Sequence, residues 1–289
     1  MTEEVRQALR ICPLGLRQAI DRLPDAGAME ELRLRCGQPP ACRIAGKEHA
    51  LPLAPVTPEL LRGILEQATQ RSAYAMQEMT RCGFVTLPGG HRLGICGTAV
   101  VQNGTITALR EPSSLNLRIA RQPDGIADRL RDALWARPQS VLLCGAPGSG
   151  KTTLLRDLIR QLSDRFGWRI CVVDERLELA ACASGVPQFR LGARTDVLSG
   201  APKAAGIELL LRTMNPEWIA VDEITAEADA RALLRAANCG VRLLATAHGT
   251  SAADLRRRSV YRPLAESGVF QTLLILRQDK SFRAERAAL

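Results

Sequence analysis

Residues 145–152 read Gly-Ala-Pro-Gly-Ser-Gly-Lys-Thr and fit the pattern G-x-x-x-x-G-K-[ST]. The apolar residues 141–144 precede this segment, and residues 153–162 follow it with leucine and isoleucine side chains at helical spacing. The segment is therefore expected to connect a buried strand to a helix. Glycines in such a connection let the backbone turn its N–H groups toward phosphate oxygens, and the helix N-terminus adds the positive end of its dipole. The pattern predicts a site for a nucleoside triphosphate; the alternative is a glycine-rich turn that binds nothing.

Two side chains of this segment have defined tasks in phosphate-binding loops. The lysine, here Lys151, reaches the β- and γ-phosphates, and the hydroxyl that follows it, here Thr152, binds Mg²⁺. We therefore expect ATP and Mg²⁺ as cofactors. The nucleotide-binding residues expected from the motif are Gly145, Ala146, Pro147, Gly148, Ser149, Gly150, Lys151, Thr152 and Thr153.

A second apolar run, residues 218–221, ends in the carboxylates of Asp222 and Glu223. In a fold with a phosphate-binding loop this strand end lies beside the loop, as a Walker B element. We expect Asp222 to bind Mg²⁺ together with Thr152, and Glu223 to orient or deprotonate the attacking water. The alternative is a pair of acids that only solvates a strand end.

The same pattern of a strand followed by acids occurs at residues 170–176, which include Asp174 and Glu175. Ligands of α/β folds bind at the carboxyl ends of strands, so this strand end is also expected near the nucleotide. Glu175 and Glu223 are therefore competing candidates for the catalytic base, and the sequence leaves the choice open. In the alternative interpretation, Asp174 and Glu175 only pair with Arg176.

A further apolar strand, residues 244–247, is followed by His248, the only histidine in the second half of the chain. Its imidazole is expected to contact the γ-phosphate or the attacking water and to take part in catalysis. The alternative is a histidine that is hydrogen-bonded in a turn, because a single histidine is a weak indication of a site.

The chain has 289 residues, of which 46% are hydrophobic, and this is enough for two cores. Residues 1–122 contain frequent prolines between short elements and are expected to form a smaller N-terminal α+β domain. Residues 123–289 alternate strands and helices, which predicts an open α/β core of the RecA-like P-loop ATPase type. The boundary is expected at residues 123–125.

The expected elements follow from these periodicities. In the first domain, strands are expected at residues 31–35, 41–44, 83–87, 91–98 and 114–120, and a helix at 58–70. In the second domain, strands are expected at 141–144, 169–174, 218–223 and 242–246, and helices at 153–162, 206–214 and 226–238. A further helix is expected to begin at residue 124 or 125 and to run through residue 134.

The formal net charge is +9, and all but four of the 39 basic residues are arginines spread along the chain. Such a charge suits an anionic membrane surface or nucleic acid. Aromatic residues make up only 3% of the chain and leave few platforms for stacking bases, so nucleic acid is not expected as a partner. The nine cysteines contain no C-x-x-C pair and are expected to be reduced thiols of a cytoplasmic protein. No run of about 18 apolar residues occurs, so membrane contact is expected to be peripheral.

Four motifs in a fixed order resemble the secretion ATPases of type II, type IV and pilus-retraction systems. They are the phosphate loop, an acidic box at residues 173–176, the Walker B strand end at 221–223 and a histidine box at 246–249. Further segments are similar, more narrowly, to the stage III sporulation protein AA family; these are residues 114–121, 186–188, 194–198, 202–204 and 207–217. Leu177 stands where this pattern is expected to carry a small polar residue.

The resemblance implies a two-domain subunit of a homo-hexameric ring that hydrolyses ATP with Mg²⁺. It also implies that arginines of the N-terminal domain reach the nucleotide and act in catalysis. The matching positions are Arg92 and Arg118, and Arg194 is a candidate for contact across a subunit boundary. Guanidinium groups suit this task because they spread the negative charge of the γ-phosphate.

The resembled family serves a membrane channel complex in endospore formation, which the ATPase is expected to power or assemble. The implied partners are further copies of the chain and membrane-embedded sporulation channel proteins. The implied location is cytoplasmic, peripheral to the membrane, on the mother-cell side of the forespore. Two other functions stay open: a nucleic-acid-dependent P-loop motor or DNA-binding ATPase, and a scaffold in which ATP joins subunits without being hydrolysed.

Overall fold

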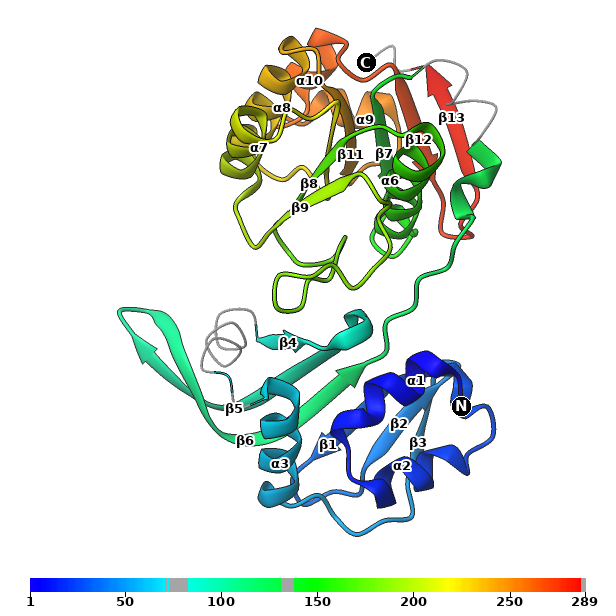
Figure 1. Ribbon diagram of the computed structural model, residues 1–289, viewed down its shortest axis with the longest axis vertical. Helices are drawn as coiled ribbons and strands as arrows, with labels where there is room; N and C mark the ends of the chain where they lie inside the picture. The colour runs from blue at the N-terminus through cyan, green and yellow to red at the C-terminus, as the bar shows by residue number, and fades with distance from the viewer. Residues whose placement is uncertain (71, 73–82, 131–137, 287–289) are drawn as a thin grey trace. The chain divides into compact units, whose positions relative to one another are not determined.

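The computed structural model describes residues 1–70, 72, 83–130 and 138–286. The chain divides into two compact units, Met1–Arg121 and Gln122–Leu289 (Figure 1). Over the described residues, no helix combines the length and the apolar composition that crossing a bilayer requires.

The first unit is built on one antiparallel sheet of six strands in the order β3-β2-β1-β6-β5-β4. The strands are β1 Met29–Arg35, β2 Ala41–Ile44, β3 Lys47–Ala50, β4 Phe84–Thr86, β5 Arg92–Gln102 and β6 Thr105–Arg118. The helices are α1 Glu3–Ala8, α2 Leu14–Asp21 and α3 Pro58–Thr69, with 3-10 turns η1 Leu9–Ile11, η2 Ala26–Ala28 and η3 Pro88–Gly90.

One face of this sheet carries the core of the first unit. Strand β1 alternates, so that Leu32 and Leu34 are buried while Arg33 and Arg35 belong to the opposite, polar face. Helices α1, α2 and α3 contribute apolar side chains to the same core. Helix α3 starts where its sequence favours it, because the hydroxyl of Thr57 accepts a hydrogen bond from the N–H of Leu60.

The longest feature of the first unit is the β5–β6 hairpin, which sequence patterns predicted only in part. Strand β5 continues past the expected end at residue 98, and β6 begins nine residues before the expected start at residue 114. Asn103 and Gly104, both with positive φ, form the two-residue turn. No described residue from 97 to 111 is buried, so this part of the hairpin lacks the inside–outside alternation by which strands are recognised.

The second unit contains a seven-stranded sheet in the order β13-β12-β7-β11-β10-β8-β9, in which every pairing is parallel except that of β12 with β13. The strands are β7 Val141–Gly145, β8 Ile170–Asp174, β9 Thr195–Ser199, β10 Trp218–Val221, β11 Arg242–Ala247, β12 Thr272–Leu276 and β13 Phe282–Arg286. The helices are α6 Lys151–Phe166, α7 Lys203–Thr213, α8 Glu227–Asn238, α9 Ala252–Arg257, α10 Arg262–Ser267 and the 3-10 helix η4 Ile126–Leu130.

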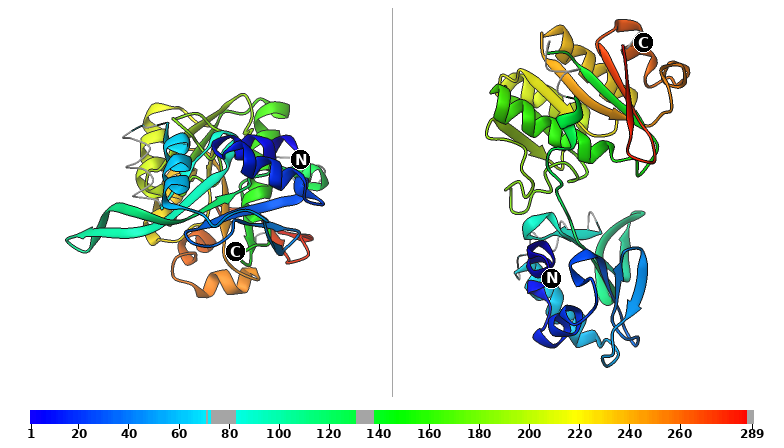
Figure 2. Two further views of the ribbon diagram at one scale, coloured as in Figure 1. Left: turned by 90° about the horizontal axis from the view of Figure 1, so that it is seen from below. Right: turned by 90° about the vertical axis from the view of Figure 1, so that its right-hand side faces the viewer.

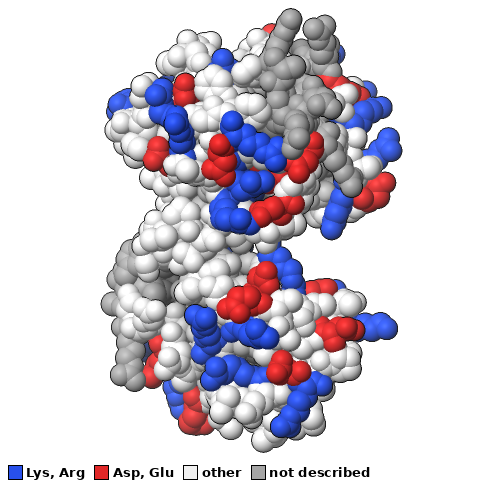
Figure 3. Space-filling model, turned by 45° about the vertical axis from the view of Figure 1, so that its right-hand side comes forward, with Lys and Arg blue, Asp and Glu red and all other residues white. Residues whose placement is uncertain are grey.

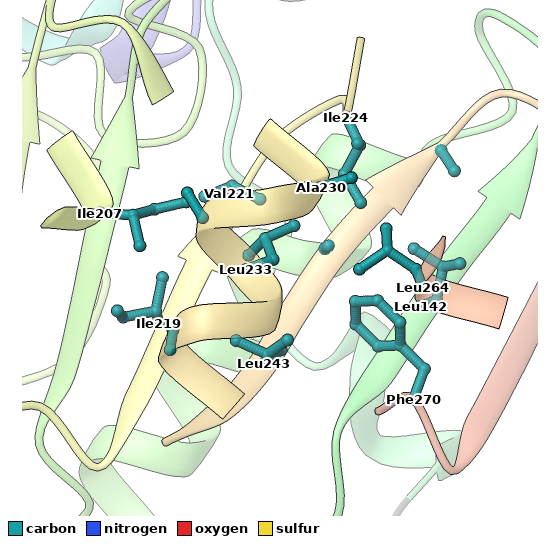
Figure 4. Close-up of a cluster of buried hydrophobic side chains, with 14 of the residues drawn as sticks. Leu142, Ile207, Ile219, Val221, Ile224, Ala230, Leu233, Leu243, Leu264 and Phe270 are labelled. Carbon is teal, nitrogen blue, oxygen red and sulfur yellow. The ribbon is translucent and has the colours of Figure 1, made fainter. Parts of the chain in front are cut away.

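Helices cover both faces of this sheet (Figures 1 and 2). Successive residues of a strand therefore enter different cores. In β7, Leu142 and Cys144 pack in the cluster of α7 and α8, whereas Val141 and Leu143 pack in the cluster of α6. Figure 4 shows the first of these clusters around α8. Burial on both faces is the physical reason for the unbroken apolar runs in the sequence.

The RecA-like α/β core expected for the second half of the chain is confirmed, with differences at the edges of its elements. The strand expected at residues 218–223 ends at Val221, so Asp222 and Glu223 lie in the following loop. The helix expected to start at residue 124 or 125 is a 3-10 helix, Ile126–Leu130, and residues 131–137 lie outside the described residues. Strands β9, β12 and β13 and helices α9 and α10 are additions to the expected pattern.

The segment that opens the second unit is hydrogen-bonded to helix α6 through the buried carboxylate of Asp157. One oxygen, Oδ2, accepts from the N–H of Ala127 at 2.8 Å and from Nε2 of Gln161 at 2.9 Å. The other, Oδ1, accepts from Nη2 of Arg160 at 2.6 Å. Burial raises the pKa of Asp157, but these hydrogen bonds outweigh it and hold the pKa below its usual value.

Candidate functional site

The predicted phosphate-binding loop connects β7 to α6, as its sequence context indicated. Gly145 is the last residue of β7, and Lys151 is the first of α6. Gly148 and Gly150 have φ values of 77° and 93°, in the left-handed region that favours glycine. Gly150 is the N-cap of α6 and no side chain caps this helix end, so the first N–H groups of the helix have no side-chain acceptor. A helix N-terminus of this kind suits phosphate oxygens.

Lys151 is only 7% exposed, and its ammonium contacts the backbone of this loop. Its Nζ donates to the carbonyl oxygens of Gly145 and Ala146, each at 2.9 Å, and lies 3.4 Å from Nδ1 of His248. Burial lowers the pKa of Lys151, and the nearby carboxylate of Asp222 opposes this shift. An ammonium has three N–H donors, and these contacts use all three.

The loop is joined directly to the end of β10 by Asp222. The hydroxyl of Thr152 donates to Oδ2 of Asp222 at 2.8 Å, and the hydroxyl of Thr246 donates to Oδ1 at 2.6 Å. Hydroxyl and carboxylate oxygens are the kind of ligand that Mg²⁺ prefers. Thr152 and Asp222 thus fit the expected metal position, both in chemistry and in being within hydrogen-bond distance of each other.

Glu223 is held on its backbone and on both carboxylate oxygens. Its φ of 54° is uncommon for a residue with a side chain, and its N–H donates to Oγ1 of Thr246 at 2.7 Å. Oε2 accepts from Nη1 of Arg176 at 2.5 Å, and Oε1 lies 2.9 Å from Nε2 of His248. These contacts keep the side chain of Glu223 in one orientation beside the loop.

His248 connects Lys151 to Glu223. Because an ammonium can only donate, Nδ1 of the imidazole accepts from Lys151. The neutral tautomer with hydrogen on Nε2 then donates to Glu223 and satisfies both contacts. Lys151, His248, Glu223 and Arg176 therefore form one hydrogen-bonded chain. The alternative of a histidine bound only within its own turn does not describe this geometry.

The acids after β8 have different partners from those at the end of β10. Asp174 is 1% exposed, and its side chain accepts from three backbone N–H groups, those of residues 178–180, at 2.8 to 3.1 Å. Glu175 pairs with the ammonium of Lys203. Arg176 reaches across to Glu223, as described above. Asp174 thus organises a turn, while Glu175 and Arg176 connect this turn to other elements.

Of the three arginines suggested by the resemblance, two lie in the first unit and one in the second. Arg92 and Arg118 belong to the first unit, where they stand opposite each other on β5 and β6. Arg92 lies over the ring of Phe84, 4.5 Å from its centroid. Arg194 donates to the carbonyl of Gly167, which follows the last residue of α6. Since the 16 residues of α6 span about 24 Å, Arg194 lies at the far end of this helix from the loop.

Three residues of this region were not among the expected site residues. Thr246 contacts both carboxylate-bearing residues after β10, and Lys203 and Asp229 form a buried pair near Glu175. A signal for Thr246 existed in the sequence, because it is the polar residue in the otherwise apolar run 244–247. Lys203 belongs to the segment 202–204 that carries the resemblance, but neither it nor Asp229 was given a role, because their partners lie far away in the sequence.

Comparisons with known proteins find relatives over most of the chain. The family model described as sporulation stage III, protein AA, matches residues 2–285. The chain is 37% identical to stage III sporulation protein AA of Bacillus subtilis (strain 168) over 283 residues, which are 96% of this chain and 92% of that protein. It is 28% identical to the uncharacterized protein ycf45 of Porphyra purpurea over 255 residues, 86% of this chain and 41% of that protein.

Two solved structures have a similar fold. The pilus retraction motor PilT, with bound ADP, gives a TM-score of 0.63 at 19% identity, covering 90% of this chain and 76% of that one. The ATPase DotB of Legionella pneumophila gives a TM-score of 0.60 at 17% identity, covering 95% of this chain and 80% of that one. At these identities the likeness concerns the fold alone, which is of the RecA-like type.

Proposed function

This chain belongs to the sporulation stage III, protein AA, family, and we propose that it uses the site described above to bind and hydrolyse ATP. The observation that carries the proposal is the hydrogen bond of 2.8 Å between Thr152 and Asp222. It joins the phosphate-binding loop to the acidic end of β10, which is the arrangement that Mg²⁺-dependent phosphoryl transfer needs. The fold shared with PilT and DotB supports the same conclusion.

The residues of the loop bind the nucleotide phosphates in this proposal. The first N–H groups of α6 donate to phosphate oxygens, together with the ammonium of Lys151. Because Lys151 already has three acceptors, phosphate oxygens replace at least one of them when nucleotide binds. Thr152 and Asp222 hold Mg²⁺, which neutralises charge on the phosphates when it is bound.

Of the two candidate bases, the contacts favour Glu223 over Glu175. A continuous hydrogen-bonded chain runs from Lys151 through His248 to Glu223, so these groups respond to one another when phosphate reaches the loop. The carboxylate of Glu175 is instead paired with Lys203. We assign the orientation of the attacking water to Glu223, and the connection between lysine and glutamate to His248.

The wider role follows from the family and the fold. We propose a homo-hexameric ring that powers or assembles a membrane channel complex in endospore formation, with Arg92 and Arg118 as nucleotide contacts and Arg194 acting on a neighbouring copy. The ring lies in the cytoplasm at the membrane, on the mother-cell side. On the face shown in Figure 3, basic side chains lie among acidic ones rather than in a block of one sign, which gives a nucleic acid no continuous basic track there.

Turnover of Mg-ATP by the purified full chain tests this function. Lys151→Ala, Asp222→Asn and Glu223→Gln are expected to lower kcat by about 100-fold or more, because each removes a group that binds phosphate, metal or water. Glu266→Gln, on the exposed surface of α10, is the matched control and is expected to retain full turnover. Unchanged turnover in Asp222→Asn would refute the proposed site.

Two further measurements separate the remaining alternatives. Light scattering with and without Mg-ATP is expected to give a molar mass above that of one chain, and a monomer under both conditions contradicts the ring. Added single-stranded DNA is expected to leave turnover unchanged. A strong, salt-sensitive stimulation by DNA favours a nucleic-acid motor instead.

A further inference from the structure

Lys203 occupies a position that is unfavourable for a charged side chain. It is 3% exposed and is the first residue of α7, at the positive end of the helix dipole. A buried ammonium requires compensating partners. Two carboxylates supply them: Glu175 forms an ion pair with Nζ, and Oδ2 of Asp229 lies 3.9 Å away. Asp229 is itself only 6% exposed.

Asp229 extends this pairing to the segment that carries Glu223. It lies in the first turn of α8, and its Oδ2 accepts from the N–H groups of Thr225 at 3.2 Å and Ala226 at 3.1 Å. These two residues follow Glu223 in the chain after a single residue. Lys203 therefore connects the acidic segment after β8, through Glu175, with the acidic segment after β10, through Asp229.

The two segments that Lys203 joins come from neighbouring strands. Strands β8 and β10 pair in parallel, so both segments begin on the same side of the sheet, where the carboxyl ends of the two strands lie. A second connection, from Arg176 to Glu223, runs between them, but the side chain of Arg176 is 58% exposed. Water and salt screen an exposed pair far more than a buried one. In the connection through Lys203 the ammonium and Asp229 are buried, while the side chain of Glu175 is 37% exposed, so this connection is screened less than the one through Arg176.

We propose that Lys203 is a positioning residue for ATP hydrolysis. It holds Glu175 and, through Asp229, the backbone after Glu223 at a fixed separation, without itself being part of the phosphate-binding loop. The inference rests on the proposed function, because the two carboxylates that it separates are the candidates for orienting water. It adds that a buried lysine outside the loop sets their geometry.

Steady-state kinetics of the full chain test this role. Lys203→Met keeps the aliphatic volume and removes the charge, and it is expected to lower kcat at least 10-fold while KM for ATP changes less than 3-fold. Lys203→Arg keeps the charge and is expected to recover kcat to within 5-fold of the wild-type chain. Lys280→Met, on an exposed turn, is the matched control. Equal kcat values for Lys203→Met and Lys280→Met would overturn the proposal.

A double-mutant comparison separates positioning from general loss of stability. If Lys203 acts through Glu175, then Lys203→Met lowers kcat much less in a chain that already carries Glu175→Gln. Fully independent effects of the two changes would exclude this route. Should Lys203→Met fail to give a folded protein by circular dichroism, Asp229→Asn replaces it, with the same expected loss of kcat and the same criterion.

A binding measurement makes the test independent of turnover. Mg-ADP with aluminium fluoride mimics the transferring phosphoryl group, whereas Mg-ADP alone does not. Lys203→Met is expected to weaken binding of the aluminium fluoride complex at least 10-fold and binding of Mg-ADP less than 3-fold. Equal losses for both ligands contradict a positioning role. If the wild-type chain binds these ligands but does not hydrolyse ATP, the proposed function is refuted, and the binding comparison still tests the role of Lys203. If the wild-type chain binds neither ligand, the proposed function and the role of Lys203 are both refuted.

Discussion

Replacing Thr246 with valine removes one buried hydroxyl that serves both acidic residues after β10. Thr246 is 0% exposed, and valine has nearly the same shape, so the change leaves no cavity. The hydroxyl donates to the carboxylate of Asp222 at 2.6 Å, and a hydrogen bond to a charged group contributes about 2 kcal/mol. It also accepts from the N–H of Glu223, and leaving this donor without a partner costs about 1 kcal/mol or more.

The free energy of unfolding is therefore expected to fall by about 3 kcal/mol in Thr246→Val. For a unit of this size that corresponds to a decrease in Tm of about 6 to 12 °C. Turnover is expected to fall at least 10-fold as well, because Asp222 and Glu223 lose the group that orients them. The assay is urea unfolding and ATP hydrolysis of the same preparations.

Thr213→Val is the matched control for this change. The hydroxyl of Thr213 is exposed and donates only to the carbonyl of Leu209 in its own helix, so its loss is expected to change stability by less than about 0.5 kcal/mol. The reasoning is refuted if Thr246→Val unfolds within 1 kcal/mol of this control and retains its turnover.

Burial lowers the pKa of His91 to about 4, so the folded chain keeps it neutral while the unfolded chain binds a proton near pH 6.5; stability is expected to fall by about 2 kcal/mol from pH 7 to pH 5. In His91→Gln the free energy of unfolding, measured with urea, is expected to decrease less between pH 7 and pH 5 than in the wild-type chain. An equal decrease in both chains contradicts the role of His91. A Cβ at Gly206 would lie 2.6 Å from Cγ1 of Val173, so Gly206→Ala is expected to cost about 1 to 3 kcal/mol in thermal unfolding; a gain in Tm contradicts the close packing. Asp174→Asn is expected to speed amide hydrogen exchange at residues 178–180 about 10-fold or more, because their N–H groups lose a charged acceptor, and unaltered exchange there disproves that anchoring role.

The core of the second unit could be predicted because its strands are buried on both faces. Strands β7, β8, β10 and β11 are short apolar runs, and each ends near a glycine, an acid or a histidine that marks the site. Strand β9 escaped prediction because it is only partly buried and contains the charged Asp196. Strand β12 is as apolar as β7, but no motif follows it to mark it as part of the site.

The site could be predicted as far as its motifs reach. Lys151, Thr152, Asp222 and His248 were identified because their chemistry follows from position relative to a loop or a strand end. Their partners could not be identified in this way. The pairing of Lys203 can be inferred only once β8 is known to lie beside β10, and no local sequence pattern predicts this strand order.

Helix α6 begins with Lys151 and Thr152 of the phosphate-loop motif, and six residues after Lys151 it carries Asp157. The carboxylate of Asp157 accepts a hydrogen bond from the N–H of Ala127, which lies in the segment through which the chain enters the second unit. Lys151 and Asp157 are about 9 Å apart along the helix axis. Less than two turns of helix and a single carboxylate thus separate the proposed nucleotide-binding loop from the peptide that enters the second unit.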